Sequence, residues 1–201
     1  MAIMRAGGGP ETSLLARGRG LWLRPLAIGD YAQWAELRAR SRDHLTPWEP
    51  EWSRDELTRD AFRRRIRHHL REARDDQGYA FAVLDERTDR LIGGLSLSNL
   101  RRGVTQSASL GYWVGLPHFR QGAMTEAVRA IIPMAFGALR LHRIEAATMP
   151  ENAPSIRVLE RNGFAREGYA RRYLKINGDW RDHILFARLA DDVGMSEGSR
   201  W

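Results

Sequence analysis

The segment between Val114 and Ala127 has the make-up of a phosphate-binding turn. Residues 111–114 predict the end of a strand, residues 119–122 a tight turn, and the residues after them a helix. The first N–H groups of a helix lack intrahelical partners, and a glycine lets the backbone approach an anion closely. Gly122 and the helix start after it therefore favour a pyrophosphate. Because glycine before a helix is also common in plain turns, this signal alone is weak.

A second helix start follows at Asn152 and Ser155, between a predicted strand at residues 144–148 and a helix that runs to about Arg161. Asn and Ser are typical N-cap residues, because their side-chain oxygens accept a hydrogen bond from the first helical turn. The sequence leaves open whether these two side chains cap the helix, take part in chemistry, or do both.

The surrounding apolar pattern predicts the elements that position these segments. Alternation predicts strands at residues 21–26, 169–176 and 180–189, and further strand signals lie at residues 79–85, 91–97, 108–114 and 144–148. Helical spacing predicts helices at residues 30–40, 53–74, 125–139 and 154–161. Asp30 is the expected N-cap of the first helix, Ser53 and Glu56 form a capping box for the second, and Asn177-Gly178 is a hairpin turn. This order predicts one α/β (α+β) domain with a mixed, mostly antiparallel sheet of about six to seven strands flanked by about four helices.

The 201 residues suit a single domain, which we expect at residues 19–190. Residues 1–18 are Gly-rich and unpatterned, so they are expected to form a disordered leader, and residues 191–201 a flexible tail. The absence of cysteine excludes disulfides and thiolate metal sites, and no apolar run approaches the length of a membrane span or signal peptide. The expected location is the cytoplasm.

The net charge of +7 comes from 32 basic and 25 acidic residues, with arginines spread along the chain. Spread-out arginine is typical of a solvated surface, whereas a footprint for RNA, the ribosome or an anionic cofactor would gather it on one face. The sequence does not choose between these two interpretations.

The two helix-start segments resemble motifs A and B of the GNAT acetyltransferases. Supporting phrases at residues 45–50, 167–173 and 177–183 resemble the branch named after RimJ and RimL, in particular the ribosomal-protein-alanine acetyltransferases. The resemblance covers about residues 21–189. It implies a fold in which the fourth and fifth strands splay apart, with the pantetheine arm of acetyl-CoA between them, and a reaction that needs no metal.

Motif A of the family reads Gln or Arg, two residues, Gly, one residue, then Gly or Ala. Here Phe119 stands at the Gln or Arg position and Met124 at the final small position, so one side-chain contact is replaced while the backbone cradle is kept. The resemblance implies that the cofactor is bound by Trp113, Val114, Arg120, Gln121, Gly122, Ala123, Met124, Thr125, Asn152 and Ser155.

The resemblance also implies catalytic roles. Ser155 matches a position near the thioester sulfur, where its hydroxyl could protonate the leaving thiolate, and Asn152 could bond the pantetheine amides or a water. Glu145 is the candidate base, directly or through water, because a carboxylate facing a cleft can have a raised pKa. Capping remains the alternative for Ser155 and Asn152, and a paired or exposed carboxylate for Glu145. Arg172 stands where some RimL-type relatives have an acidic base, so that role does not transfer.

The expected acceptor is a protein N-terminus, attacked directly in a ternary complex. An α-amine, with a pKa near 7.7 to 8.0, is partly neutral in the cytoplasm, whereas a lysine amine near 10.4 would cost roughly 4 kcal/mol to deprotonate. By the resemblance, Trp48 and Glu49 border the acceptor groove, although a tryptophan at a turn is also common in core packing.

The expected partner is therefore a protein N-terminus such as that of a ribosomal protein, with no membrane or direct nucleic-acid partner, and a monomer or homodimer. Two alternatives remain. One is a GNAT enzyme that acetylates a small amine or antibiotic; the other is a catalytically weak module with this fold that binds the ribosome or RNA.

Overall fold

The computed structural model describes residues 15–192, so residues 1–14 of the expected leader and residues 193–201 of the expected tail lie outside the described part. Within it, one eight-stranded sheet has the order β1-β2-β3-β4-β5-β6-β8-β7. All neighbouring strands are antiparallel except β5 and β6. The strands are β1 (Ala16–Gly18), β2 (Leu21–Pro25), β3 (Tyr79–Asp85), β4 (Leu91–Arg101), β5 (Ser107–Val114), β6 (Arg143–Thr148), β7 (Ala165–Ile176) and β8 (Asp179–Leu189). The predicted mixed, mostly antiparallel α/β domain is confirmed.

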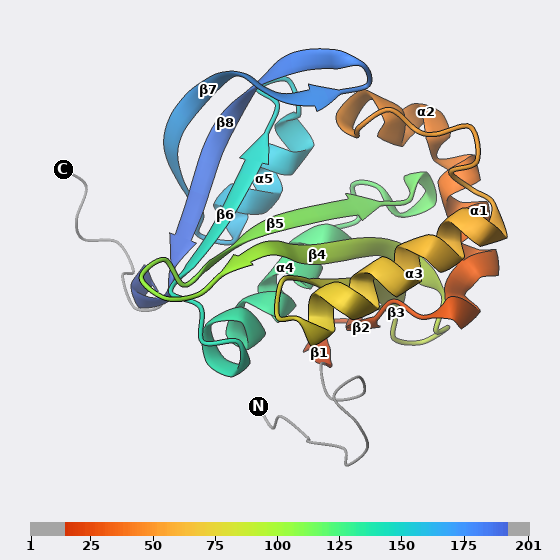
Figure 1. The fold of residues 1–201 in the computed structure, drawn as a ribbon, viewed down its shortest axis with the longest axis horizontal. Helices are drawn as coiled ribbons and strands as arrows, with labels where there is room; N and C mark the ends of the chain where they lie inside the picture. Colours follow the sequence, from red (N-terminus) through yellow and green to blue (C-terminus); the bar gives the residue numbers. More distant parts are fainter. Residues whose placement is uncertain (1–14, 193–201) are drawn as a thin grey trace.

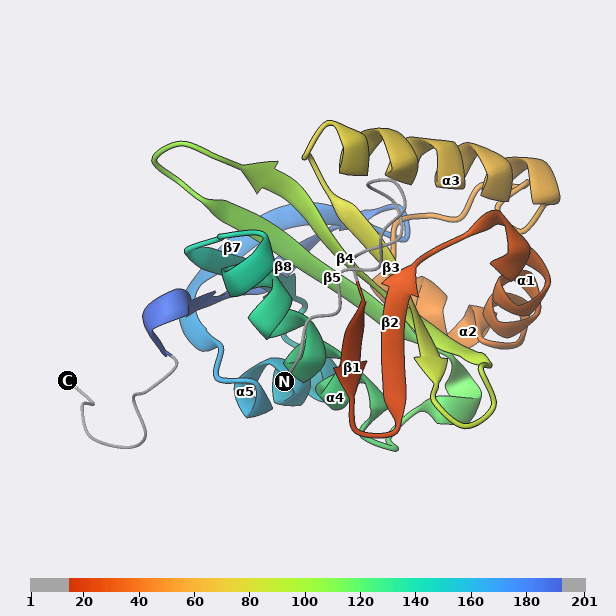
Figure 2. The same ribbon diagram turned by 90° about the horizontal axis from the view of Figure 1, so that it is seen from below.

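Helices cover both faces of this sheet, as Figures 1 and 2 show. They are α1 (Tyr31–Arg40), α2 (Arg42–Leu45), α3 (Arg59–Arg74), α4 (Ala123–Pro133) and α5 (Ala153–Arg161). The main core lies between the sheet and α4 and α5, and a second cluster lies under α1 and α3 on the opposite face. Side chains alternate along a strand, so each strand sends every second residue to one of these two faces.

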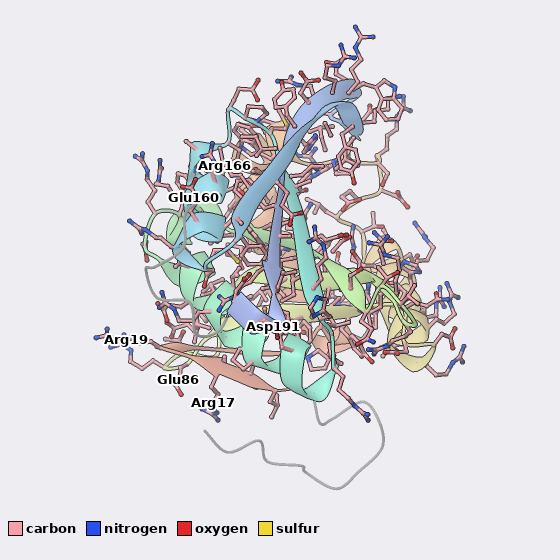
Figure 3. The ribbon with its side chains drawn as sticks, turned by 90° about the vertical axis from the view of Figure 1, so that its left-hand side faces the viewer. Arg17, Arg19, Glu86, Glu160, Arg166 and Asp191 are labelled. Carbon is pink, nitrogen blue, oxygen red and sulfur yellow. The ribbon has the colours of Figure 1, made fainter. Side chains whose placement is uncertain are left out.

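The sheet begins earlier than the sequence indicated, because residues 16–18 of the expected leader form β1 and pair with β2. Buried Ala16 packs in the main core, and Arg17 forms a 2.8 Å ion pair with Glu86 at the surface. Figure 3 shows this pair, together with Arg166 and Glu160, which link β7 to α5. A three-residue strand is too short to show alternation, which explains why the pattern missed it.

The start of α3 is also corrected. Its N-cap is Thr58, whose Oγ1 accepts a hydrogen bond from Ala61 N at 3.2 Å, so the helix begins at Arg59 and not after Ser53. The expected capping-box glutamate, Glu56, is instead paired with Arg65. The Glu56 carboxylate is therefore engaged by an arginine of α3 and does not form the expected capping box.

Candidate active site

The two parallel strands at the centre of the sheet separate after three paired positions. Their pairing runs from Ser107 with Arg143 to Ser109 with Glu145. Beyond that point β5 continues to Val114 and β6 to Thr148, but the two strands no longer pair with each other. Figure 1 shows them diverging. The opening holds a cavity of about 650 Å³, lined by both separated strands and by the starts of α4 and α5. Such a cavity is large enough for part of an extended ligand.

The start of α4 offers backbone donors to this cavity. Gly122 is the N-cap in the left-handed region, with a φ of 81°, and no side chain caps the helix. The first helical hydrogen bond runs from Glu126 N to Gly122 O. The N–H groups of residues 123–125 therefore have no acceptor within the helix. Together with the positive end of the helix dipole, these donors fit phosphate oxygens.

Three arginines on the cavity wall strengthen this fit. Arg120 lies in the turn before α4, and Arg157 and Arg161 lie on α5. Within residues 15–192, no ion pair to a carboxylate is formed by any of the three. Their positive charge is therefore available to an anionic ligand.

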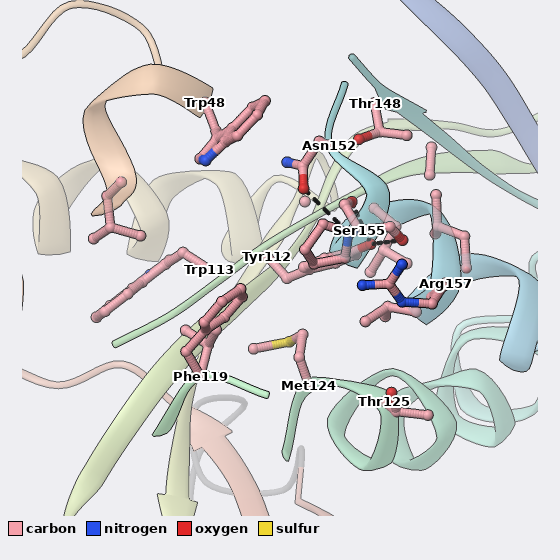
Figure 4. Close-up of a pocket in the computed structure, with 18 of the residues that line it drawn as sticks. Trp48, Tyr112, Trp113, Phe119, Met124, Thr125, Thr148, Asn152, Ser155 and Arg157 are labelled. Carbon is pink, nitrogen blue, oxygen red and sulfur yellow. Dashed lines mark hydrogen bonds between the residues drawn. The ribbon is translucent and has the colours of Figure 1, made fainter. Parts of the chain in front are cut away.

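At the start of α5, Asn152 and Ser155 have different tasks. Asn152 is the N-cap, and its Oδ1 accepts a hydrogen bond from Ser155 N at 3.2 Å (Figure 4). The hydroxyl of Ser155 takes no part in this cap. It lies 2.9 Å from the hydroxyl of Tyr112 on β5. The cap is therefore supplied by Asn152, and a catalytic role for Ser155 stays a prediction.

Tyr112 links β5 to the first turn of α5 through its contacts with Ser155. Its hydroxyl is within reach of two oxygens of Ser155, Oγ at 2.9 Å and the main-chain O at 3.2 Å. When Tyr112 donates to Oγ, the proton of Ser155 is free to be donated into the cavity. Burial raises the pKa of Tyr112 well above its ordinary value, so the phenol keeps its proton at neutral pH.

The loop after α2 closes another side of the cavity. Trp48, 36% exposed, and Glu49 both line it. The carboxylate of Glu49 accepts hydrogen bonds from both terminal nitrogens of Arg38, at 3.1 and 2.6 Å, and from Trp52 Nε1 at 2.7 Å. Arg38 is buried between tryptophan rings, with its guanidinium 4.3 Å from the ring centre of Trp52 and 5.1 Å from that of Trp113. These hydrogen bonds hold the Glu49 side chain in a fixed position at the cavity wall.

Trp113 and Val114 line the cavity on β5, beyond the last position at which β5 pairs with β6. The indole of Trp113 turns to the α1 face, and a Cβ on Gly94 would lie 2.4 Å from its Nε1. Only glycine fits at position 94, because a side chain there would overlap the Trp113 indole. Phe119 also lines the cavity, and its ring meets His44 edge-on at 4.5 Å between centroids.

Two of the residues predicted from the sequence are not brought to the cavity. The side chain of Gln121 donates to Pro117 O at 2.8 Å and stabilises the turn. Glu145 lies at the last paired position of β5 and β6, and its carboxylate accepts from Arg101 at 2.7 Å and Arg143 at 2.9 Å. A carboxylate held by two arginines outside the cavity wall is not placed to act as a base.

The remaining predicted residues do line the cavity. They are Trp113, Val114, Arg120, Gly122, Ala123, Met124, Thr125, Asn152, Ser155, Trp48 and Glu49. The sequence reasoning missed Tyr112, Arg157 and His183. Alternation in β5 could have indicated Tyr112, since it shares a face with Leu110 and Val114 and a buried hydroxyl needs a partner. For His183, the only signal was its place in the predicted final strand.

Comparison with known proteins agrees with this geometry. Residues 20–165 match the acetyltransferase (GNAT) domain family. The chain belongs to the GNAT acetyltransferases and is an acetyl-CoA-dependent N-acetyltransferase.

Its relatives place it in the RimJ and RimL branch. It is 39% identical over 178 residues to the probable N-acetyltransferase YjcK of Bacillus subtilis, covering 89% of this chain and 98% of that protein. It is 34% identical to the [ribosomal protein uS5]-alanine N-acetyltransferase of Escherichia coli, covering 79% and 81%. Mycobacterium smegmatis RimJ, solved with CoA-disulfide, superposes with a TM-score of 0.85 at 34% identity and covers 93% of this chain and 91% of that one.

Two features are absent from the part of the chain that the structure describes. No helix among residues 15–192 is both long and apolar enough to cross a membrane. The same residues contain no group of three or more His, Asp or Glu side chains arranged to hold a metal ion.

Proposed function

We propose that this enzyme transfers the acetyl group of acetyl-CoA to the α-amine of a protein N-terminus, by direct attack in a ternary complex. The observation that carries the proposal is the two-sided cavity. Tyr112 and Ser155 approach it from the face of α4 and α5, whereas Trp48 and Glu49 approach it from the face of α1. A thioester between the strands would have its leaving group on one side and its attacking amine on the other.

The backbone of β5 would hold the thioester in this arrangement. Beyond Ser109, its outer N–H and C=O groups have no partner strand, so they can pair with the amides of a pantetheine arm. An N–H near Val114 would donate to the thioester oxygen as that oxygen becomes negative. Comparable oxyanion donors contribute roughly 3 to 4 kcal/mol to the transition state.

Ser155 would complete the transfer on the sulfur side. When its oxygen accepts from Tyr112, the Ser155 hydroxyl can donate its proton to the departing thiolate. Asn152 orients the first turn of α5, through its bond to Ser155 N, so that this hydroxyl faces the cavity.

The preference for an α-amine rests on its acidity and on the relatives. At neutral pH a lysine amine is roughly 3 pKa units from its neutral form, whereas an α-amine is within about 1 unit. The Escherichia coli relative is described as a [ribosomal protein uS5]-alanine N-acetyltransferase. A ribosomal protein is therefore the proposed acceptor.

The test is acetylation of defined peptides by the purified chain. Peptides beginning with Ala, Ser or Met would be compared with N-formylated copies that contain an internal lysine, and with a panel of polyamines and aminoglycosides. We expect label on the free N-termini alone, located by mass spectrometry. Transfer to blocked lysine peptides or small amines, with none to free N-termini, would contradict the proposed acceptor.

A further inference from the structure

His183 on β8 reaches the cavity from the side opposite Ser155. In the β6–β8 ladder, Ala146 lies opposite Phe186, and both belong to the core under α4 and α5. Side chains alternate along β8, so His183 points to the other face, the one that bears α1 and the loop of Trp48. The residue is 3% exposed and lines the cavity wall. This is the side from which the proposed acceptor amine enters.

The hydrogen bond of the imidazole fixes which nitrogen can accept a proton. Nδ1 lies 3.0 Å from the main-chain O of Arg181. A carbonyl oxygen only accepts, so Nδ1 carries a hydrogen and the neutral ring has its lone pair on Nε2. The ring of Tyr173 packs edge-on against the imidazole, with 5.8 Å between centroids. Within residues 15–192, no side chain or main-chain group forms a hydrogen bond with Nε2 of His183.

The other titratable side chains near this side of the cavity are engaged or lie elsewhere. Glu49 is held by Arg38 and Trp52, and Glu145 is held by two arginines outside the cavity wall. His44 packs on Phe119, and His118 directly precedes Phe119 in the segment that leads to α4, so both histidines line the cavity near the start of α4. His183 is left as a basic group on the acceptor side with a free lone pair.

The charged groups near His183 come from its own strand and from β7, where Ala170 is its partner and Arg171 and Arg172 follow. On its own strand, Arg181 lies 3.5 Å from Glu151, and Asp182 accepts from Tyr169 and from Arg172 N. The residues of β6 beside it, Ala147 and Thr148, are uncharged.

We propose that His183 is the proton acceptor for the acceptor amine, an inference that rests on the proposed acetyl transfer. Nε2 takes one proton from the incoming ammonium group and passes it to water. The neutral nitrogen then attacks the thioester carbon, an N–C bond forms and the C–S bond breaks. The nitrogen loses a second proton as the amide forms, and the thiolate gains one proton through Ser155. These two transfers cancel, so one proton is released per acetyl group transferred.

The test uses two variants that separate the nitrogens of the ring. His183→Asn keeps an N–H near the position of Nδ1 and removes Nε2, whereas His183→Gln places an amide near Nε2 but cannot take up a proton. For both, we expect kcat/KM at pH 7 to fall on the order of 100-fold. The loss should shrink as the pH rises above about 8, where the amine is already neutral without help. Each variant should still unfold cooperatively and keep the wild-type CoA affinity, as should the control variant His142→Asn, which lies outside the cavity wall.

The inference fails if either folded variant keeps kcat/KM within threefold of wild type at pH 7, or if the loss is equal at pH 7 and pH 9.5. It also fails if His44→Asn shows the pH-dependent loss in place of the His183 variants. The ratio is taken on whichever amine the wild-type chain acetylates. Failure of the proposed acceptor class, seen with wild-type protein alone, is therefore distinct from failure of the role of His183.

Discussion

The hydroxyl of Tyr112 lies 2.9 Å from that of Ser155, 43 residues further along the chain, and joins β5 to the first turn of α5. Because Asn152 supplies the helix cap, the Ser155 hydroxyl is not needed to satisfy the backbone. Tyr112 can supply a proton to Ser155 Oγ, which leaves the serine proton directed at the cavity. The contact turns a residue that sequence reasoning could assign to either capping or chemistry into a candidate proton donor.

Replacing the serine tests that role. Ser155→Ala should lower kcat on the order of 100-fold, as expected for a general acid, while CoA affinity changes little. Tyr112→Phe should lower kcat about tenfold, the effect of one hydrogen bond worth about 1.4 kcal/mol in the transition state. Steady-state kinetics with melting curves on the same samples provide the measurement. A Ser155→Ala enzyme that retains turnover within threefold would assign thiolate protonation to water.

The helix cap formed by Asn152 should contribute to the stability of the folded chain. Asn152→Ala removes the bond to Ser155 N and should cost about 1 kcal/mol, which lowers the melting temperature by roughly 2 to 4 °C. Thr58→Ala is a matched control, since Thr58 caps α3 in the same way away from the cavity. Equal stability losses with an activity loss confined to Asn152→Ala would be the expected pattern. Full stability in Asn152→Ala would show that the cap is not needed.

Gly122 should be sensitive through its backbone conformation. Its φ is 81°, and no atom lies within 4 Å of the position that a Cβ would occupy. A side chain would therefore have room, but the backbone conformation is strained for any residue other than glycine. Gly122→Val should therefore reshape the turn, weaken CoA binding by tenfold or more, and cost roughly 1 to 2 kcal/mol of stability. Gly20→Val, at a φ of 72° in the β1–β2 turn and equally open, should lose similar stability without losing affinity. Calorimetric titration with CoA distinguishes them; equal affinity in both variants would place the phosphates elsewhere.

CoA should stabilise the folded chain. At ~100 times its dissociation constant, a ligand contributes roughly 2.7 kcal/mol, which raises the melting temperature of a domain of this size by roughly 5 to 10 °C. A thermal shift series with CoA, and with adenosine as a control that lacks phosphates, measures this. No shift at millimolar CoA would contradict a cofactor site in the cavity.

The sequence by itself determined most of the local structure. A run of apolar residues located β3 at residues 79–85. Asn177 and Gly178, with φ values of 45° and 90°, form the turn that their residue types favour. Gly122 was found for the same reason, since a left-handed residue before a helix is a property of a few consecutive residues. The resemblance to the GNAT family then predicted many of the residues that line the cavity.

The tertiary structure alone decided which side chains meet. Glu145 is held by Arg101, 44 residues away, and Tyr112 meets Ser155 only because β5 leaves β6 after Ser109. Local spacing fixes the face of its own strand or helix to which a side chain points, but not which distant element is packed against that face. Strand order, register and the point of separation come from the packing of the whole sheet, so the partners that make a side chain reactive, or occupy it, follow from the fold.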